Sequence, residues 1–262
     1  MTNRSDGRWA ELATRLGAAR LSARPMTGLK PADLPTDEPA AYAVQDALIR
    51  AAGARPQAWK VGATSSAAQA GMGLTQPFAG PVFSGHIQHV AGTLAATALI
   101  APKFEPEIAV ILKDDLVPSG RPVTAADARG AIGSVHPAIE VVDCRFEDGL
   151  RLGGLALIAD CGINAALLLG PAGSEALPDY DSVALDVRVD GSTISGRVAP
   201  PPETEPSLML AWLANHLHGR GLGLRAGDIV TTGSQAGMIP LPGAGLVEVD
   251  FGTLGRVSLR IE

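Results

Sequence analysis

The chain has 262 residues, enough for one large domain or for a main body with a smaller appendage. The hydrophobic fraction of 46% is that of an ordinary folded protein, and the aromatic fraction of 4% means that aliphatic side chains must build the core. The net charge of −6, without a basic run or basic–aromatic interleaving, argues against a nucleic-acid surface.

No segment of the sequence reads as a membrane span or an export signal. The first nine residues are polar, and the most apolar stretch, 155–170, is interrupted by Asp160 and Asn164. Cys144 and Cys161 are too few for a disulfide framework and suit a reducing compartment. We therefore expect a cytoplasmic protein that binds neither membrane nor nucleic acid.

The N-terminal region predicts two helices. Apolar residues at helical spacing predict the first over 6–24. A proline near the first turn marks a second helix, from Asp37 to about Gly53. Because 31 Gly and 20 Pro favour turns and strands elsewhere, we expect an N-terminal helical part, 1–55, and a β-rich body, 56–262.

The body begins with a short predicted strand at 59–62. Residues 63–85 are punctuated by Gly and Pro and read as a loop that could contain one helical turn, and loops of this length often bind ligands. The remaining predicted elements are strands at 86–101, a helix at 124–133, a buried strand at 155–169 broken near Asp160, a strand at 183–189 with a hairpin turn at Asp190-Gly191, a helix at 207–219, and strands near 228–232, 246–251 and 256–261.

Alternating side chains mark residues 103–112 as a strand with one apolar face. Glu105 and Glu107 share the opposite face, because strand side chains have a period of two. A third carboxylate, Glu140, lies in another apolar strand. A Glu-x-Glu pair alone is more often the solvent face of a strand, but burying a lone carboxylate is costly. Three carboxylates without thiol or imidazole partners favour Mg²⁺ or Mn²⁺ over zinc.

Two further segments carry candidate polar groups. Lys60 precedes the Gly-rich loop and is a candidate for proton transfer if it is desolvated near a metal, although a surface lysine is the alternative. The stretch 227–234 ends in hydroxyl residues and Gly, which suit an anion, or it is a turn followed by a core strand. Ser65 in the loop could bind a substrate carboxylate.

Several motifs occur in a characteristic order: Trp59-Lys60-Val61-Gly62, Gln76-Pro77, Glu105-Pro106-Glu107-Ile108-Ala109, Pro137-Ala138-Ile139-Glu140-Val141-Val142 and Gly227-Asp228-Ile229-Val230-Thr231-Thr232-Gly233. With this order the sequence resembles the 2-keto-4-pentenoate hydratase and 4-oxalocrotonate decarboxylase branch of the fumarylacetoacetate hydrolase superfamily, over roughly residues 40–260. The resemblance implies an α+β fold, with a mixed β-roll or barrel body and a small N-terminal helical part.

The resemblance also implies roles for individual residues. It implies Mg²⁺ or Mn²⁺ held by Glu105, Glu107 and Glu140, with Lys60 as the catalytic residue. The candidate substrate-binding residues are Ser65, Gln76 and Thr232.

The implied function is a metal-dependent lyase that hydrates 2-hydroxypenta-2,4-dienoate-type substrates of aromatic catabolism through a metal-chelated enolate. A 4-oxalocrotonate-type decarboxylase would share that enolate. Phe78 stands where the family usually has an acid, which keeps decarboxylation open. The sequence also leaves open a diverged non-catalytic partner subunit and a C–C bond hydrolase. The resemblance further implies a homo-oligomer, with association with a related hydratase or decarboxylase as an option.

Overall fold

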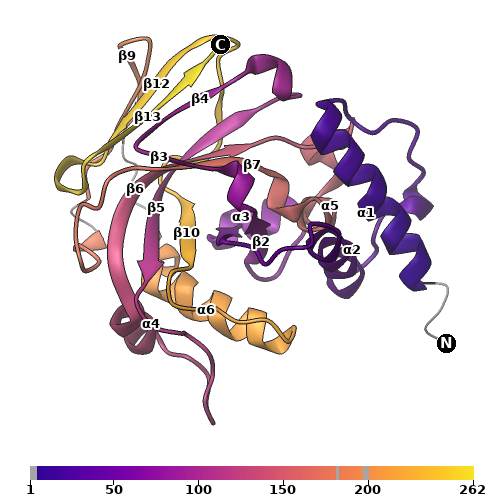
Figure 1. Ribbon diagram of the computed structural model, residues 1–262, viewed down its shortest axis with the longest axis horizontal. Coiled ribbons are helices and arrows are strands. Elements are labelled where there is room, and N and C mark those ends of the chain that lie inside the picture. The colour runs from indigo at the N-terminus through magenta and orange to yellow at the C-terminus, as the bar shows by residue number, and fades with distance from the viewer. Residues whose placement is uncertain (1–4, 181–182, 197–200) are drawn as a thin grey trace.

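The computed structural model describes residues 5–180, 183–196 and 201–262 (Figure 1). The α-helices are α1 (Ser5–Ser22), α2 (Glu38–Ala51), α3 (Ser66–Met72), α4 (Ala125–Ala131), α5 (Gly154–Ala159) and α6 (Pro206–Gly219). The strands are β1 (Ala58–Gly62), β2 (Phe78–Val82), β3 (Ile87–His89), β4 (Ala91–Leu94), β5 (Lys103–Leu112), β6 (Ile132–Val142), β7 (Asn164–Leu169), β8 (Asp186–Val189), β9 (Ser192–Gly196), β10 (Ile229–Ser234), β11 (Ile239–Pro240), β12 (Gly245–Asp250) and β13 (Arg256–Ile261).

The strands form two sheets. The larger has the order β2-β1-β10-β5-β6-β7-β3, with β11 paired to one end of β5, and the smaller has the order β4-β13-β12-β8-β9. The larger sheet is curled, the smaller lies at the upper left of Figure 1, and α4 and α6 lie below the long strands. The arrangement confirms the predicted α+β fold with a rolled β body.

The main core lies against the apolar face of β5. Phe104, Ile108 and Val110 are fully buried there, together with leucines of α6 and valines of β12. Side chains on one strand alternate between its two faces, so Glu105 and Glu107 must lie on the other side. The alternation predicted for 103–112 is therefore confirmed, and it orients the polar side chains away from the main core.

The N-terminal helices share a separate apolar cluster with the body. Leu12 and Leu16 of α1 and Val44 of α2 pack with Phe146 and with Ala156 of α5. At the right of Figure 1, α2 lies next to both α1 and α5, and it contacts both. These helices therefore complete their core with residues that follow the long strands in sequence.

Two predicted elements differ from the structure. The buried strand expected at 155–169 is the helix α5 followed by β7, because a short apolar run does not distinguish a strand from a buried helix. The loop expected at 63–85 contains β2. Pro81 is tolerated in that strand because β2 lies at the edge of the larger sheet.

The helices and the terminal hairpin predicted elsewhere are confirmed within a few residues. Within the described residues, no helix combines the length and the apolar character needed to cross a bilayer.

Candidate active site

The two long strands bring the three glutamates together. The antiparallel register of β5 and β6 pairs Glu105 directly with Glu140, and Glu107 follows on the same face of β5. One carboxylate oxygen from each residue lies within 4.8 Å of the other two. Glu107 and Glu140 are buried, and the side chain of Glu105 is 14% exposed.

Lys60 reaches the same point from β1. Its strand is separated from β5 by β10, and the side chain is 4% exposed. The Lys60 Nζ lies 3.2 Å from Glu140 Oε2 and 3.9 Å from Glu105 Oε2. The centre of the Phe78 ring lies 5.3 Å from the same Nζ, so the ammonium contacts carboxylates on one side and an aromatic ring on another.

Two neighbouring groups hold the buried carboxylates in place. The backbone N–H of Gly233 donates to Glu107 Oε2 at 2.7 Å, and Asn164 Nδ2 donates to Glu140 Oε1 at 2.9 Å. Gly233 has a φ of +110°, and a Cβ there would lie 2.6 Å from the Thr64 side chain. Glycine is therefore required at this position by both backbone conformation and space.

The charges in the cluster perturb one another. Burial raises the pKa of Glu105 to about 7, while Lys60 acts in the opposite direction. Burial, followed by repulsion from Glu140 and Glu105, raises the pKa of Glu107 well above its usual value. Burial alone would lower the pKa of Lys60, but the three carboxylates outweigh it and raise that pKa.

These residues fit a divalent cation. The donors are carboxylate oxygens, the ligands preferred by Mg²⁺ and Mn²⁺, and they converge from two fixed strands. Lys60 balances one of three potential negative charges. Repulsion from Glu140 and Glu105 contributes, after burial, to the raised pKa of Glu107, and a divalent cation would relieve that repulsion. The roles of the glutamates as metal ligands and of Lys60 as the catalytic residue stay predictions.

A cavity of about 330 Å³ opens beside the glutamates, and Glu105 forms part of its wall. Next to the lining residue Ser65, Ser66 Oγ donates a hydrogen bond of 3.2 Å to Glu203 Oε1. The described residues that line the cavity are Val61, Gly62, Ala63, Thr64, Ser65, Ala68, Met72, Glu105, Pro201, Thr204, Gly233, Ser234, Gln235, Ala236, Gly237 and Met238.

The candidate substrate-binding residues occupy different positions. Ser65 lines the cavity and also caps α3 by accepting from Ala68 N at 3.2 Å. Thr232 is buried and donates to the Ile108 carbonyl at 2.9 Å. Gln76 donates to Glu38 of α2 at 2.7 Å and is not among the residues that line the cavity.

Sequence reasoning missed two polar side chains of the site. Asn164 orients Glu140, and an amide within an apolar run is a signal that could have identified it, since buried polar groups need partners. Gln235 lines the cavity and donates to the Gly233 carbonyl at 3.1 Å and to Tyr180 Oη at 3.3 Å. Nothing in the local pattern around Gln235 distinguishes it from a loop residue.

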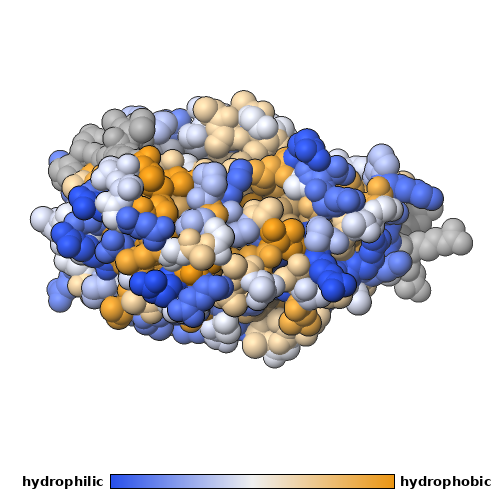
Figure 2. All heavy atoms as spheres, turned by 90° about the horizontal axis from the view of Figure 1, so that it is seen from above, coloured by the Kyte–Doolittle hydropathy of each residue, from blue (hydrophilic) through white to orange (hydrophobic). Residues whose placement is uncertain are grey.

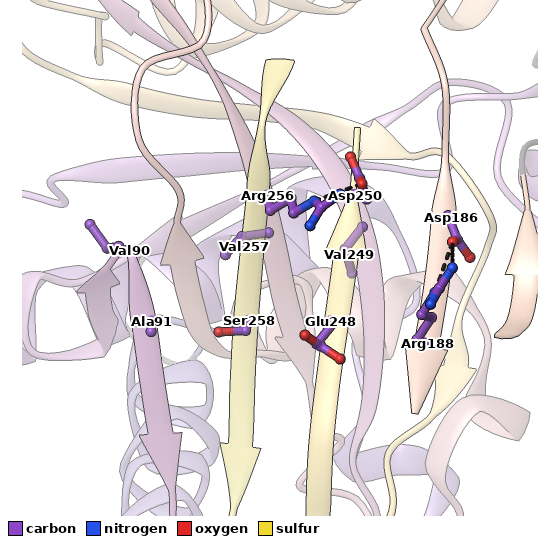
Figure 3. Close-up of a pocket in the computed structure, with 10 residues that line it drawn as sticks. All are labelled: Val90, Ala91, Asp186, Arg188, Glu248, Val249, Asp250, Arg256, Val257 and Ser258. Atoms are coloured by element: carbon purple, nitrogen blue, oxygen red, sulfur yellow. Dashed lines mark hydrogen bonds and ion pairs between the residues drawn. The ribbon is translucent and has the colours of Figure 1, made fainter. Parts of the chain in front are cut away.

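A separate hollow of about 360 Å³ lies on the outer face of the smaller sheet (Figure 3). Its two arginines are already paired with acidic neighbours, Arg188 with Asp186 and Arg256 with Asp250, each at 2.7 Å. This hollow therefore offers less unbalanced charge than the glutamate cluster and is the weaker candidate.

Comparison with known proteins gives relatives that match nearly the whole chain. The chain is 33% identical over 258 residues to a 2-keto-4-pentenoate hydratase of Paraburkholderia phymatum, which covers 96% of this chain and 97% of that protein. It is 30% identical over 203 residues to a 4-oxalocrotonate decarboxylase of Pseudomonas putida, which covers 77% and 75% of the two chains.

The structure is also similar to a solved one. The 4-oxalocrotonate decarboxylase from Pseudomonas putida G7, complexed with magnesium and adipate, superimposes with a TM-score of 0.87 at 26% identity, covering 98% of each chain. The family model for the fumarylacetoacetate (FAA) hydrolase C-terminal domain matches residues 58–262. This match covers the glutamate cluster, Lys60 and the adjoining cavity, and the protein therefore belongs to the FAA hydrolase family.

Proposed function

We propose that the protein is a metal-dependent hydratase that acts on 2-hydroxypenta-2,4-dienoate and similar short 2-oxo acids of aromatic-ring breakdown. The observation that carries the proposal is the convergence of three carboxylates and one buried ammonium beside a cavity. The hydratases among the similar proteins support it.

The three glutamates are the proposed cation ligands. Glu105, Glu107 and Glu140 would hold Mg²⁺ or Mn²⁺, with Asn164 and the Gly233 N–H fixing two of the carboxylates. Such a cation supplies Lewis-acid polarisation of the 2-oxo and carboxylate oxygens of the substrate. The adjoining cavity has room for the rest of a short carbon chain.

Lys60 is the proposed proton donor and acceptor. Among the described residues it is the cationic group within 4 Å of Glu105 and Glu140, and its burial keeps its proton from exchanging freely with bulk water. As an ammonium it can donate a proton to C5 of the dienol, and the resulting amine can accept the proton of the 2-hydroxyl group. Water then adds across C3 and C4 of the 2-oxo-3-enoate, with its hydroxyl at C4 and its proton at C3, which completes the hydration.

Decarboxylation is the second candidate, and Phe78 favours it. The Phe78 ring lies close to Lys60 and packs in an apolar cluster, so it cannot orient a water molecule as an acid in its place would. One of the similar proteins is a 4-oxalocrotonate decarboxylase. Loss of CO₂ would leave a negative charge on the carbon chain of the substrate, as an enolate. Lys60 could then protonate that enolate, as it would in the hydratase reaction.

Two substrates separate the candidates. Metal-depleted protein should be inactive, and Mg²⁺ or Mn²⁺ should restore the loss of ultraviolet absorbance of 2-hydroxypenta-2,4-dienoate. Release of CO₂ from 2-oxo-hex-3-enedioate would instead support the decarboxylase. Turnover that survives complete chelation would contradict both.

A matched pair of variants tests the ligands. Glu105→Gln keeps the size of the side chain but removes its charge, and should abolish cation-dependent turnover. Glu248→Gln makes the same change on the exposed outer face of the smaller sheet and should retain it. Equal activity in the two variants would contradict the assignment of Glu105.

We also propose a cytoplasmic homo-oligomer. Hydrophobic and hydrophilic side chains are interspersed on the face seen in Figure 2. Sedimentation of the purified protein tests the assembly, and a mass equal to one chain would contradict it.

A further inference from the structure

A second cavity lies on the same side of β5 as the first. It has a volume of about 330 Å³. Lys103 and Val142, which pair across β5 and β6, both line it, just as Glu105 lines the first cavity and pairs with Glu140. The two cavities therefore follow one another along the same face of the same strand pair.

The distance between them is short. Lys103 and Glu105 are two residues apart on β5, which corresponds to about 7 Å along a strand. Both side chains must project to the same side. A ligand that extends from the glutamate cluster along β5 would thus arrive at Lys103.

Met238 lines both cavities. The short strand β11 pairs Ile239 with Phe104 and Pro240 with Lys103. Continuing this antiparallel register by one residue places Met238 beside Glu105, on the face where the glutamates lie. Met238 also packs against the apolar cluster that contains Phe78 and Ile163.

The cavities differ in charge. Among the described residues that line the first, Glu105 is the one charged side chain, and several others are apolar. The second contains Lys103, which is half-buried and forms no ion pair with the described residues. Its other charged residues, Glu147, Asp148 and Arg151, are exposed, and Arg151 is paired with Asp148.

We infer that Met238 is a specificity-determining residue, which limits the substrate to 2-oxo acids with a short uncharged tail and closes off a second subsite built to take a distal carboxylate at Lys103. The inference rests on the proposed function. It explains how two cavities of similar volume can follow one another along β5 while a single small substrate uses only the first.

The test compares a monocarboxylate with a dicarboxylate. The kcat/KM values of 2-hydroxypenta-2,4-dienoate and 2-oxohept-4-ene-1,7-dioate are measured with Mg²⁺-loaded protein. The wild type should favour the monocarboxylate, and Met238→Ala should shift the ratio towards the dioate by about tenfold or more. Adding Lys103→Gln to Met238→Ala should remove most of this gain.

Met72→Ala is the matched control. It makes the same substitution at a residue that lines only the first cavity, and the dioate ratio should stay within about threefold of the wild-type value. A wild type that prefers the dioate, or equal shifts in the two variants, would overturn the inference. Met238→Val replaces Met238→Ala if the latter does not fold.

Calorimetry distinguishes failure of the inference from failure of the proposed function. Binding of 2-oxopentanoate and 2-oxoadipate to the Mg²⁺-loaded proteins does not depend on turnover. If neither unsaturated substrate is turned over but Met238→Ala still gains affinity for 2-oxoadipate, the proposed reaction is wrong and the second subsite stands. If turnover occurs but Met238→Ala changes neither the ratio of the two kcat/KM values nor the affinity for 2-oxoadipate, Met238 does not separate the cavities.

Discussion

Lys60 is deeply buried and has two carboxylates within 4 Å. Its replacement should therefore have opposite effects on catalysis and on cation binding. Lys60→Met should lower kcat by about 100-fold or more, the usual range for loss of a general acid–base group. The same change should strengthen cation binding, because a positive charge near Glu140 is removed.

Kinetics and calorimetry on the same Lys60→Met preparation check the two effects separately. A variant that keeps full activity would show that Lys60 is structural. One that loses both activity and cation binding would show that Lys60 mainly positions the glutamates.

His216 gives a prediction for stability against pH. Burial, reinforced by Arg220, lowers the pKa of His216 to about 4 from 6.5. The unfolded chain therefore takes up a proton at a higher pH than the folded protein, so His216 contributes stability above about pH 6.5 that is lost towards pH 4.

His216→Phe should keep the stacking against Trp212 while removing this titration. Urea unfolding midpoints should then fall less steeply than in the wild type between pH 6.5 and 4. His218→Phe, at an exposed position of the same helix, is the control and should retain the wild-type slope. Identical slopes for all three proteins would contradict the role of His216.

Single residues were predictable from sequence where charge and burial conflicted. Glu105, Glu107 and Glu140 were identified because carboxylates in apolar strands need a partner, and they do lie together. The contacts of Gln76 and Thr232 depend on which strands and helices become neighbours, and no local pattern in the sequence contains that information.

At the scale of elements, β1, β2 and the turn after α5 pack without spare room. A Cβ added to Gly80 of β2 would lie 2.5 Å from the Cys161 carbonyl and 3.0 Å from Lys60 Cγ. Gly80→Ala should therefore destabilise the fold by about 1–3 kcal/mol, as overpacking does. It should also lower activity, because the stem of Lys60 must shift.

Gly71→Ala is the control for that change. Gly71 lies inside α3, and an added Cβ would meet nothing within 4 Å. Because alanine favours helix over glycine, this variant should gain about 0.5–1 kcal/mol. Thermal melts compare the two, and a Gly80→Ala protein as stable as the wild type would contradict the packing argument.

Elements with a clear period were predictable, and those without one were not. The first half of β5, residues 103–107, alternates between charged and apolar side chains, and α1 and α6 carry apolar stripes. The apolar run of α5 has no such period. Its helical form follows from packing against α1 and α2, which is a tertiary effect.

At the scale of the whole molecule, cation binding should stabilise the fold. A ligand that binds only the folded state adds about 2.7 kcal/mol at 100 times its Kd. The melting temperature should therefore rise by several degrees on adding Mg²⁺ or Mn²⁺, and Glu107→Gln should lose most of the increase.

Sodium chloride at equal ionic strength is the control for screening. An identical rise with sodium chloride, or none with either divalent cation, would contradict a specific site. The larger ion-dependent rise would also indicate which of the two cations the cluster prefers.

The overall architecture was predictable as α+β with a rolled β body, since motif order carried that information. The sharing of one apolar cluster by α1, α2 and α5 was not, because α5 follows the two N-terminal helices by more than 100 residues.

The pairing of β5 with β6 also has a consequence for correct folding. A slip of one residue in this pairing would turn every side chain of the slipped strand to the opposite face. The glutamates would then face the hydrophobic core, and the large aliphatic side chains would be exposed to solvent. A chain with this shifted register would be both inactive and prone to aggregate. Specific activity per folded molecule should consequently report how faithfully these two strands were aligned during folding.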